Sequence, residues 1–200
     1  MPISDPSRRT FLLGMAFGAL TMAGPAAALT QAESRSLIDR VMGEVQGIIN
    51  SGAPEPRMIA QFEELFQRYG DVPAIARSAL GPPARAASAA QLSAFTNAFR
   101  GYMGRKYGRQ FRRFAGARAE VLGSREVQGY WEVITTMTMR GEPPFEVRWQ
   151  VSDRSGRPLF FNLIIEGVNL LAAERQEIGT MLERRGGNLD RMIQDLQQAG

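Results

Sequence analysis

The spacing of the apolar residues changes near Ala117, and this change constrains the fold more than any other feature of the sequence. Before Ala117 the apolar residues recur every three to four positions, as on one face of an α-helix, and after it they alternate with polar residues, as in a β-strand. A helical pattern returns at Leu170. Helices, then strands joined by short turns, then helices indicate an α+β domain with an antiparallel sheet of about four strands.

Local motifs place the individual elements. Thr30 with Glu33, and Ser88 with Gln91, are capping boxes, in which each side chain can accept a hydrogen bond from the backbone of the other residue at a helix start. The expected helices cover about 31–50, 58–69, 72–80, 88–114, 170–185 and 188–198. The expected strands cover about 119–125, 131–139, 145–151 and 159–165, and the turn at 153–156 closes a hairpin.

The apolar surface is large for so small a sheet. One face of the three later strands carries Trp131, Val133, Thr135, Met137, Met139, Phe145, Val147, Trp149, Val151, Leu159, Phe161, Leu163 and Ile165. The long helix adds Phe95, Phe99, Tyr102, Met103, Tyr107, Phe111 and Phe114. Aromatic and methionine side chains adapt to irregular partners, so a helix layer held off a curved sheet would leave an apolar cavity. The ordinary alternative is a filled core of helices on a sheet.

The N-terminus resembles an export signal. Arg8-Arg9 lead into the uncharged apolar run 11–23, and Ala26-Ala27-Ala28 supply the small residues of an A-x-A cleavage site. The run is shorter than the roughly 20 residues that cross a bilayer. Paired arginines before Phe and Leu favour the Tat pathway, with an ordinary Sec signal as the alternative. We expect cleavage before Leu29 and a mature protein in the periplasm.

Removal of residues 1–28 leaves 29–200, which is enough for one domain with its own core. The sequence contains no cysteine and no histidine. This composition excludes thiol nucleophiles, Ser-His triads and the usual zinc ligands, and it favours a binding protein over an enzyme. The net charge of +4 is too small for a dedicated nucleic-acid binder.

A basic stripe adjoins the apolar face of the long helix. It consists of Arg105, Lys106, Arg109, Arg112 and Arg113. A solvated face is the usual explanation of such a run, and the alternative is a contact surface for an anionic membrane or an acidic partner. Arg100 falls on the apolar side instead, so it either extends its charged end to water or meets an anion near the mouth of the cavity.

The segment Ile164-Ile165-Glu166-Gly167-Val168-Asn169-Leu170, followed by Arg175, resembles the MlaC family of periplasmic phospholipid-binding proteins, also called the toluene-tolerance family. The family pattern has serine where Asn169 stands and commonly aspartate where Asn162 stands. The aromatic pattern of the long helix and the short helix ending in Leu80-Gly81 are also similar to the family's. The resemblance covers roughly residues 35–198.

The resemblance implies an NTF2-like, MlaC-like fold with an apolar cavity between sheet and helices. It also implies a soluble, monomeric shuttle that takes a phospholipid across the periplasm and maintains outer-membrane lipid asymmetry. The implied partners are an inner-membrane ABC transporter with MCE domains and an outer-membrane lipoprotein complex, with bound phospholipid as cargo and no cofactor or metal. The expected lipid-binding residues are Phe99, Tyr102, Met103, Tyr107, Phe111, Val133, Thr135, Met137, Val147, Trp149, Val151, Phe161, Leu163 and Ile165. Arg100, Arg105, Arg109, Arg112 and Arg113 are the expected head-group or partner contacts.

Three residues beside the last strand have an expected structural role. Glu166 ends this strand and Arg175 lies early in the following helix, so we expect them to pair across the Gly167 turn. Two other functions remain open: an enzyme of the ketosteroid-isomerase or NTF2-like kind, which would need a buried carboxylate in its cavity, and a structural adaptor of the envelope with a filled core.

Overall fold

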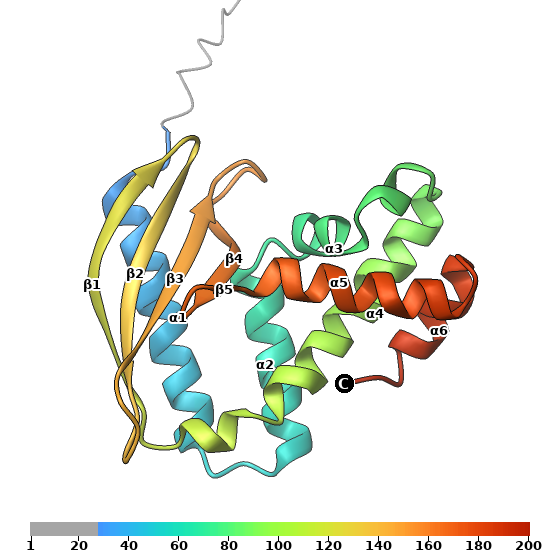
Figure 1. The fold of residues 1–200 in the computed structure, drawn as a ribbon. Coiled ribbons are helices and arrows are strands. Elements are labelled where there is room, and N and C mark those ends of the chain that lie inside the picture. The colour runs from blue at the N-terminus through green and yellow to red at the C-terminus, as the bar shows by residue number, and fades with distance from the viewer. Residues whose placement is uncertain (1–27) are drawn as a thin grey trace, which may run out of the picture.

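The structure, a computed structural model, describes residues 28–200 as an α+β domain (Figure 1). The helices are α1 (Gln31–Asn50), α2 (Glu55–Tyr69), α3 (Val72–Leu80), α4 (Ala89–Gly108), α5 (Leu170–Arg184) and α6 (Leu189–Leu196), with short 3-10 turns η1 (Pro82–Arg85) and η2 (Phe111–Phe114). The strands are β1 (Arg118–Val127), β2 (Tyr130–Thr138), β3 (Phe145–Ser152), β4 (Leu159–Ile165) and β5 (Val168–Asn169). The α+β class is confirmed, and the predicted signal peptide lies outside the described residues except for Ala28.

Both predicted capping boxes are confirmed. At the start of α1 the hydroxyl of Thr30 accepts from the backbone N–H of Glu33, and the Glu33 carboxylate accepts from the backbone N–H of Thr30. Ser88 and Gln91 make the same reciprocal pair at the start of α4. The long helix is shorter than predicted, because α4 ends at Gly108 and the chain continues as η2.

The five strands form one antiparallel sheet in the order β1-β2-β3-β4-β5. Each strand therefore pairs with its neighbour in the sequence, as expected for strands joined by short turns. The strand that sequence periodicity missed is β5, whose two residues are too few to show an alternation. Glu166 and Gly167, with φ of 48° and 82°, form the tight turn before it.

The helices lie on one side of the sheet in successive layers. α1 packs on β1, β2 and β3, α2 packs on α1, and α4 packs on α2, α3 and α6 (Figure 1). The expectation that the long helix faces the sheet was wrong, because α1 and α2 lie between them. Amphipathic spacing shows that a helix buries one stripe, but it does not show which element covers that stripe.

A β-bulge between Gln150 and Val151 corrects the predicted register of β4. The bulge pairs Val151 with Phe160, and the Phe160 ring contacts the rings of Phe66 and Trp149 on the core side. Phe161 instead packs edge-on against Tyr130 on the opposite face of the sheet. Strict alternation would have put Phe161 in the core, and the extra residue of the bulge moves Phe160 there.

Candidate functional site

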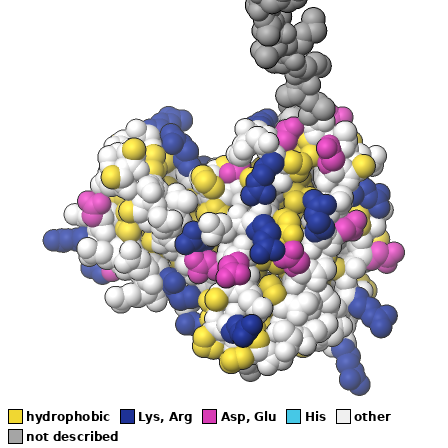
Figure 2. All heavy atoms as spheres, turned by 180° about the vertical axis from the view of Figure 1, so that it is seen from behind, with side chains coloured by type: hydrophobic (Ala, Val, Ile, Leu, Met, Phe, Trp, Pro, Cys, Tyr) yellow, Lys and Arg dark blue, Asp and Glu magenta, His cyan; other side chains and the backbone are white. Residues whose placement is uncertain are grey.

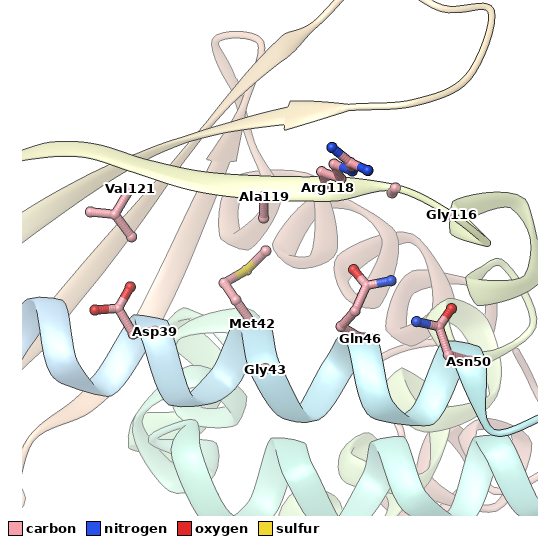
Figure 3. Close-up of a pocket in the computed structure, with 10 residues that line it drawn as sticks. Asp39, Met42, Gly43, Gln46, Asn50, Gly116, Arg118, Ala119 and Val121 are labelled. Carbon is pink, nitrogen blue, oxygen red and sulfur yellow. The ribbon is translucent and has the colours of Figure 1, made fainter.

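A groove of about 670 Å³ runs between α1 and the edge strand β1 (Figure 3). Its lining residues are Asp39, Met42, Gly43, Gln46, Asn50, Gly116, Ala117, Arg118, Ala119 and Val121. Such a volume is in the usual range for sites of small organic ligands. The groove lies between a helix and a sheet, as the sequence predicted, but its helix wall is α1 and not the long helix α4.

The α1 wall of the groove is a single stripe of the helix. Asp39, Met42, Gln46 and Asn50 are three or four residues apart, and their side chains point toward β1 (Figure 3). Gly43 lies in the same wall, and a Cβ built on it would meet no atom within 4 Å. The missing side chain at Gly43 therefore leaves open space in the groove.

The β1 wall connects the groove to the predicted lipid-binding face of the sheet. Val121 and Ala119 point toward α1 (Figure 3), and their partners across the strand pair are Thr135 and Met137. Thr135 in turn pairs with Val147 on β3. Because residues paired directly across strands share a face, the β1 wall of the groove lies on the same face of the sheet as these residues.

That interior face is closed by well-packed side chains. Val133 and Val151 are fully buried, and Val147 and Trp149 are 4% and 8% exposed. The buried hydroxyl of Thr135 donates to the carbonyl oxygen of Val147 (3.0 Å) and accepts from Trp149 Nε1 (3.1 Å). The structure thus brings the predicted residues of β2 and β3 together, while Met137, Leu163 and Ile165 lie half-buried beside them.

The predicted residues of α4 lie elsewhere. Phe99, Tyr102 and Met103 are buried among the helices, where the Phe99 ring contacts that of Tyr102. None of the predicted lipid-binding residues whose side chains the structure describes lines the α1–β1 groove. The side chains of Phe111 and Arg112 are outside the described part of the chain.

A buried polar cluster joins α4 to α5. Glu174 is 1% exposed, and its Oε1 accepts from the hydroxyl of Tyr107 (2.5 Å) and from Lys106 Nζ (2.7 Å). Burial and the nearby Glu174 carboxylate raise the pKa of Tyr107 and of Tyr102. Burial opposes the charge of Lys106, but hydrogen bonds to Glu174 and Glu177 raise its pKa. These groups hold two helices together, and they lie apart from the groove-lining residues.

The remaining basic residues of α4 mostly make intramolecular contacts. Arg100 pairs with Glu63 of α2 (2.8 Å), so it is not at the mouth of the groove. Arg105 donates to the carbonyl oxygens of Leu196 at the end of α6 and of Ala199 beyond it, and Arg109, which follows α4, donates to that of Gly200. Arg113 is exposed, and the head-group or partner contacts expected for these arginines stay a prediction.

The expected pair of Glu166 and Arg175 is absent from the ion pairs of residues 28–200, which corrects the prediction. Glu166 is exposed in the turn between β4 and β5, whereas the Arg175 guanidinium packs against Gly81 at the end of α3. A Cβ on Gly81 would lie 3.0 Å from Arg175 Nε. The Arg175 side chain therefore lies in the contact between α3 and α5.

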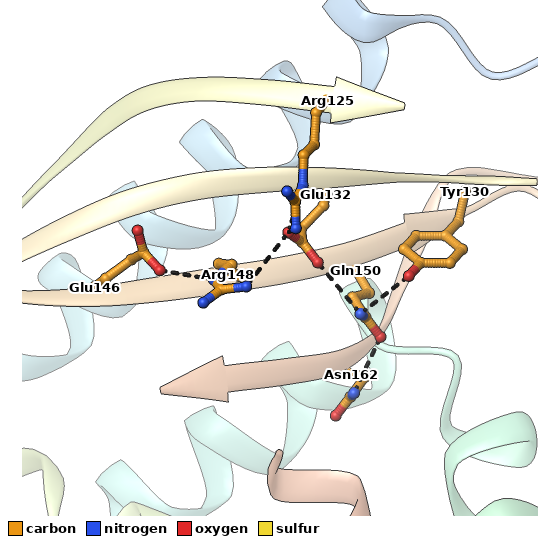
Figure 4. Close-up of polar contacts among 7 residues, drawn as sticks. All are labelled: Arg125, Tyr130, Glu132, Glu146, Arg148, Gln150 and Asn162. Atoms are coloured by element: carbon orange, nitrogen blue, oxygen red, sulfur yellow. Dashed lines mark hydrogen bonds and ion pairs between the residues drawn. The ribbon is translucent and has the colours of Figure 1, made fainter. Parts of the chain in front are cut away.

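The outer face of the sheet carries a polar network around Glu132 (Figure 4). Glu132 is 2% exposed and accepts from Arg125 (2.6 Å) and from Gln150 (3.4 Å). Asn162 donates to Gln150, and its Oδ1 accepts from the backbone N–H of Leu171. The network connects four strands to the start of α5 and leaves the Glu132 carboxylate paired.

Both departures from the family pattern keep their local hydrogen bonds. Asn169 caps α5 by accepting from the backbone N–H of Ala172 (3.0 Å), as a serine could, and Asn162 accepts from the preceding N–H, that of Leu171 (3.1 Å).

The surface has no single basic face in the view from behind (Figure 2), where Lys and Arg side chains alternate with acidic and apolar ones. Within residues 28–200, no helix is both long and apolar enough to cross a membrane. The same residues contain no group of three or more acidic side chains placed to hold a metal ion.

The groove residues of α1 were missed by sequence reasoning, although the sequence contained a signal. Gly43 and Gly47 lie four residues apart within a helix, where each glycine costs about 1 kcal/mol relative to alanine. Two such residues on neighbouring turns indicate a place where space is needed more than helix stability.

Comparisons with known proteins agree with the architecture. The model of the MlaC protein family matches residues 39–198. Among solved structures, the phospholipid-binding protein from Ralstonia solanacearum, in complex with a phospholipid, superposes with a TM-score of 0.69 at 17% identity. The match covers 84% of this chain and 94% of that protein. At this identity the likeness shows a shared fold.

Proposed function

The chain belongs to the MlaC family, and we propose that it is a carrier that holds the acyl chains of a phospholipid between α1 and the sheet. The observation that carries the proposal is the groove between α1 and β1, whose β1 wall lies beside an apolar face of the sheet. The phospholipid in the structure of the Ralstonia protein of the same fold supports it.

The groove suggests how a lipid enters. Met42, Ala119 and Val121 give its walls an apolar character, while Gln46 and Asn50 add polar groups toward one end (Figure 3). We infer that an acyl chain enters between α1 and β1 and extends along the sheet face as the interior side chains move aside. The head group stays in water, so it needs no elaborate polar site.

The energetics of lipid transfer explain why such a carrier must release its cargo only while docked. Two acyl chains expose roughly 30 methylenes, and at about 0.8 kcal/mol each their transfer into water costs about 24 kcal/mol. Escape over a barrier of that height would take on the order of a day. A dry site removes most of this cost, and release therefore requires a partner with its own apolar channel against the mouth of the groove.

The proposed compartment and partners rest on the predicted signal peptide and on the family resemblance. The proposed signal peptide would direct the protein to the periplasm, through the Tat pathway if the paired arginines are recognised. There it would work as a monomer between an outer-membrane lipoprotein complex and an MCE-domain ABC transporter, and so maintain lipid asymmetry.

Binding without catalysis is the better supported function. The NTF2-like enzyme alternative needs a buried carboxylate in the cavity. Within residues 28–200 the buried acidic side chains are Asp71, Glu132 and Glu174, and none of them lines the groove. Glu132 and Glu174 are paired with cations, Asp71 accepts from the hydroxyl of Ser155, and the groove's own Asp39 is exposed.

Lipid extraction tests the proposal against a structural adaptor. The exported protein is purified without detergent, extracted with organic solvent and analysed for phospholipid by mass spectrometry. The carrier should yield phospholipid near one molecule per chain. A monomer that contains no lipid, and takes none up from vesicles, would support the adaptor.

A further inference from the structure

The first residue after the predicted cleavage site is held tightly by the sheet. The backbone N–H of Leu29 donates to Asp153 Oδ2 (3.0 Å), and the carbonyl oxygen of Leu29 accepts from Trp131 Nε1 (2.8 Å). The Leu29 side chain packs against the core, whereas the preceding residue, Ala28, is exposed. Side chains from β2 and from the turn after β3 thus fix both backbone groups of a single residue.

The sequence places the end of the signal peptide at this residue. Ala26-Ala27-Ala28 form the predicted A-x-A site, so cleavage after Ala28 makes Leu29 the first residue of the mature protein. Water adds across the Ala28–Leu29 peptide bond, the carboxylate leaves with Ala28, and the amide nitrogen of Leu29 becomes an ammonium group. A neutral donor facing Asp153 therefore becomes a charged one.

We propose that signal-peptide removal creates an ion pair between the new ammonium group of Leu29 and Asp153, which fastens the start of α1 to the sheet. A charge-assisted hydrogen bond of this kind is roughly twice as strong as a neutral one. The cleavage site is thus also a structural site, and the mature protein differs from its precursor in the folded domain and not only in length.

The surrounding charges leave Asp153 available for this pair. Within residues 28–200, Asp153 makes no ion pair with an arginine or lysine. Glu33, the acidic residue nearest in the first turn of α1, is tied to Thr30 by the capping box. The guanidinium of Arg154, next to Asp153 in the turn, lies against Gly129.

The Leu29–Asp153 ion pair has a consequence for the groove, and this consequence rests on the proposed function. α1 forms one wall of the groove, and Leu29 precedes its first turn, so the ion pair holds that wall against the sheet at one end. A precursor that keeps residue 28 has the neutral hydrogen bond alone. Its α1 should therefore be held less firmly, and it should lose bound lipid faster than the mature protein.

The test compares four proteins. One begins at Leu29, released from a fusion by a protease that leaves no extra residue, and one keeps Ala28 with its amino group acetylated, so that no other ammonium group lies beside Asp153; each is made with Asp153 and with Asp153→Asn. Ala28 is exposed, so the added residue brings no steric clash. We expect Asp153→Asn to lower the melting temperature of the Leu29 protein clearly, and to have a much smaller effect in the protein that keeps Ala28.

The pH dependence gives a second readout. An α-amino group ordinarily has a pKa of about 7.7–8.0, and pairing with a carboxylate should raise the pKa of the Leu29 amino group in the folded state. The extra stability of the Leu29 protein should thus be present below about pH 8 and disappear as the pH rises through the folded-state value. NMR titration of the amino group measures the shift directly.

Three results would overturn the proposal: an equal effect of Asp153→Asn in both lengths of protein, an amino group with an ordinary pKa, or an exported protein whose mass shows a first residue other than Leu29. None of them depends on lipid. A failure of the carrier function would appear instead as absent phospholipid in all four proteins.

Discussion

Filling the groove at Gly43 is the sharpest perturbation that the structure offers. Gly43→Trp places an indole in the open space between α1 and β1, where a built Cβ meets no atom within 4 Å. Replacing a helix-interior glycine also removes a cost of about 0.5–1 kcal/mol, so the fold should be as stable as before or more stable. Loss of lipid would then reflect occupation of the site and not unfolding.

The expected magnitude follows from the surface that the indole buries. A tryptophan buries up to about 200 Å², and if half of this lies in the groove, at about 25 cal/mol per Å² the indole gains about 2.5 kcal/mol there. A lipid must displace the indole to enter, so its affinity should fall on the order of 100-fold.

The assay measures equilibrium occupancy of the protein with fluorescent phospholipid over a range of donor-vesicle concentrations. Gly179→Trp is the matched control, because Gly179 is also a helical glycine with open space around its Cβ position but lies on α5, away from the groove. Equal occupancy in Gly43→Trp and wild type, or an equal loss in Gly179→Trp, would refute the assignment of the groove as the lipid entrance.

Three further predictions address packing, pairing and docking. Phe160→Ala should destabilise the protein by about 3–5 kcal/mol in urea unfolding and Phe161→Ala by clearly less; the reverse order would contradict the bulged register. Lys106→Met should lower the free energy of unfolding by about 3–5 kcal/mol in the same assay, because it leaves the buried Glu174 carboxylate without its cation. An unchanged free energy of unfolding would show that water replaces the cation. Arg113→Glu should slow lipid transfer to acceptor membranes at low salt while lipid occupancy is retained, and an unchanged transfer rate would mean that this side chain is merely solvated.

Sequence patterns predicted the elements of the fold well. The capping boxes at Thr30 and Ser88 marked helix starts to the residue, because a cap is a local arrangement of neighbouring groups. The change to alternation after Ala117 located the sheet, and short turns made sequential antiparallel pairing the simplest topology.

Long-range arrangement was less accessible from the sequence. The aromatic face of α4 had the composition of a cavity wall, yet it packs on other helices, because apolar spacing does not identify the partner surface. The bulge beside Val151 shifted one residue of β4 between faces, which strict alternation cannot reveal. The predicted Glu166–Arg175 pair is absent because the Arg175 guanidinium packs against Gly81 of the α3 end, a contact between distant segments that the local sequence does not reveal.

The central claim, that the interior between α1 and the sheet holds a phospholipid, is tested most directly by native mass spectrometry of the mature protein purified from the periplasm without detergent. The account predicts a complex heavier than the chain by the mass of one phospholipid, and conversion to the bare chain when the gas-phase energy is raised. A single species at the mass of the bare chain, unchanged after incubation with phospholipid vesicles, would contradict it.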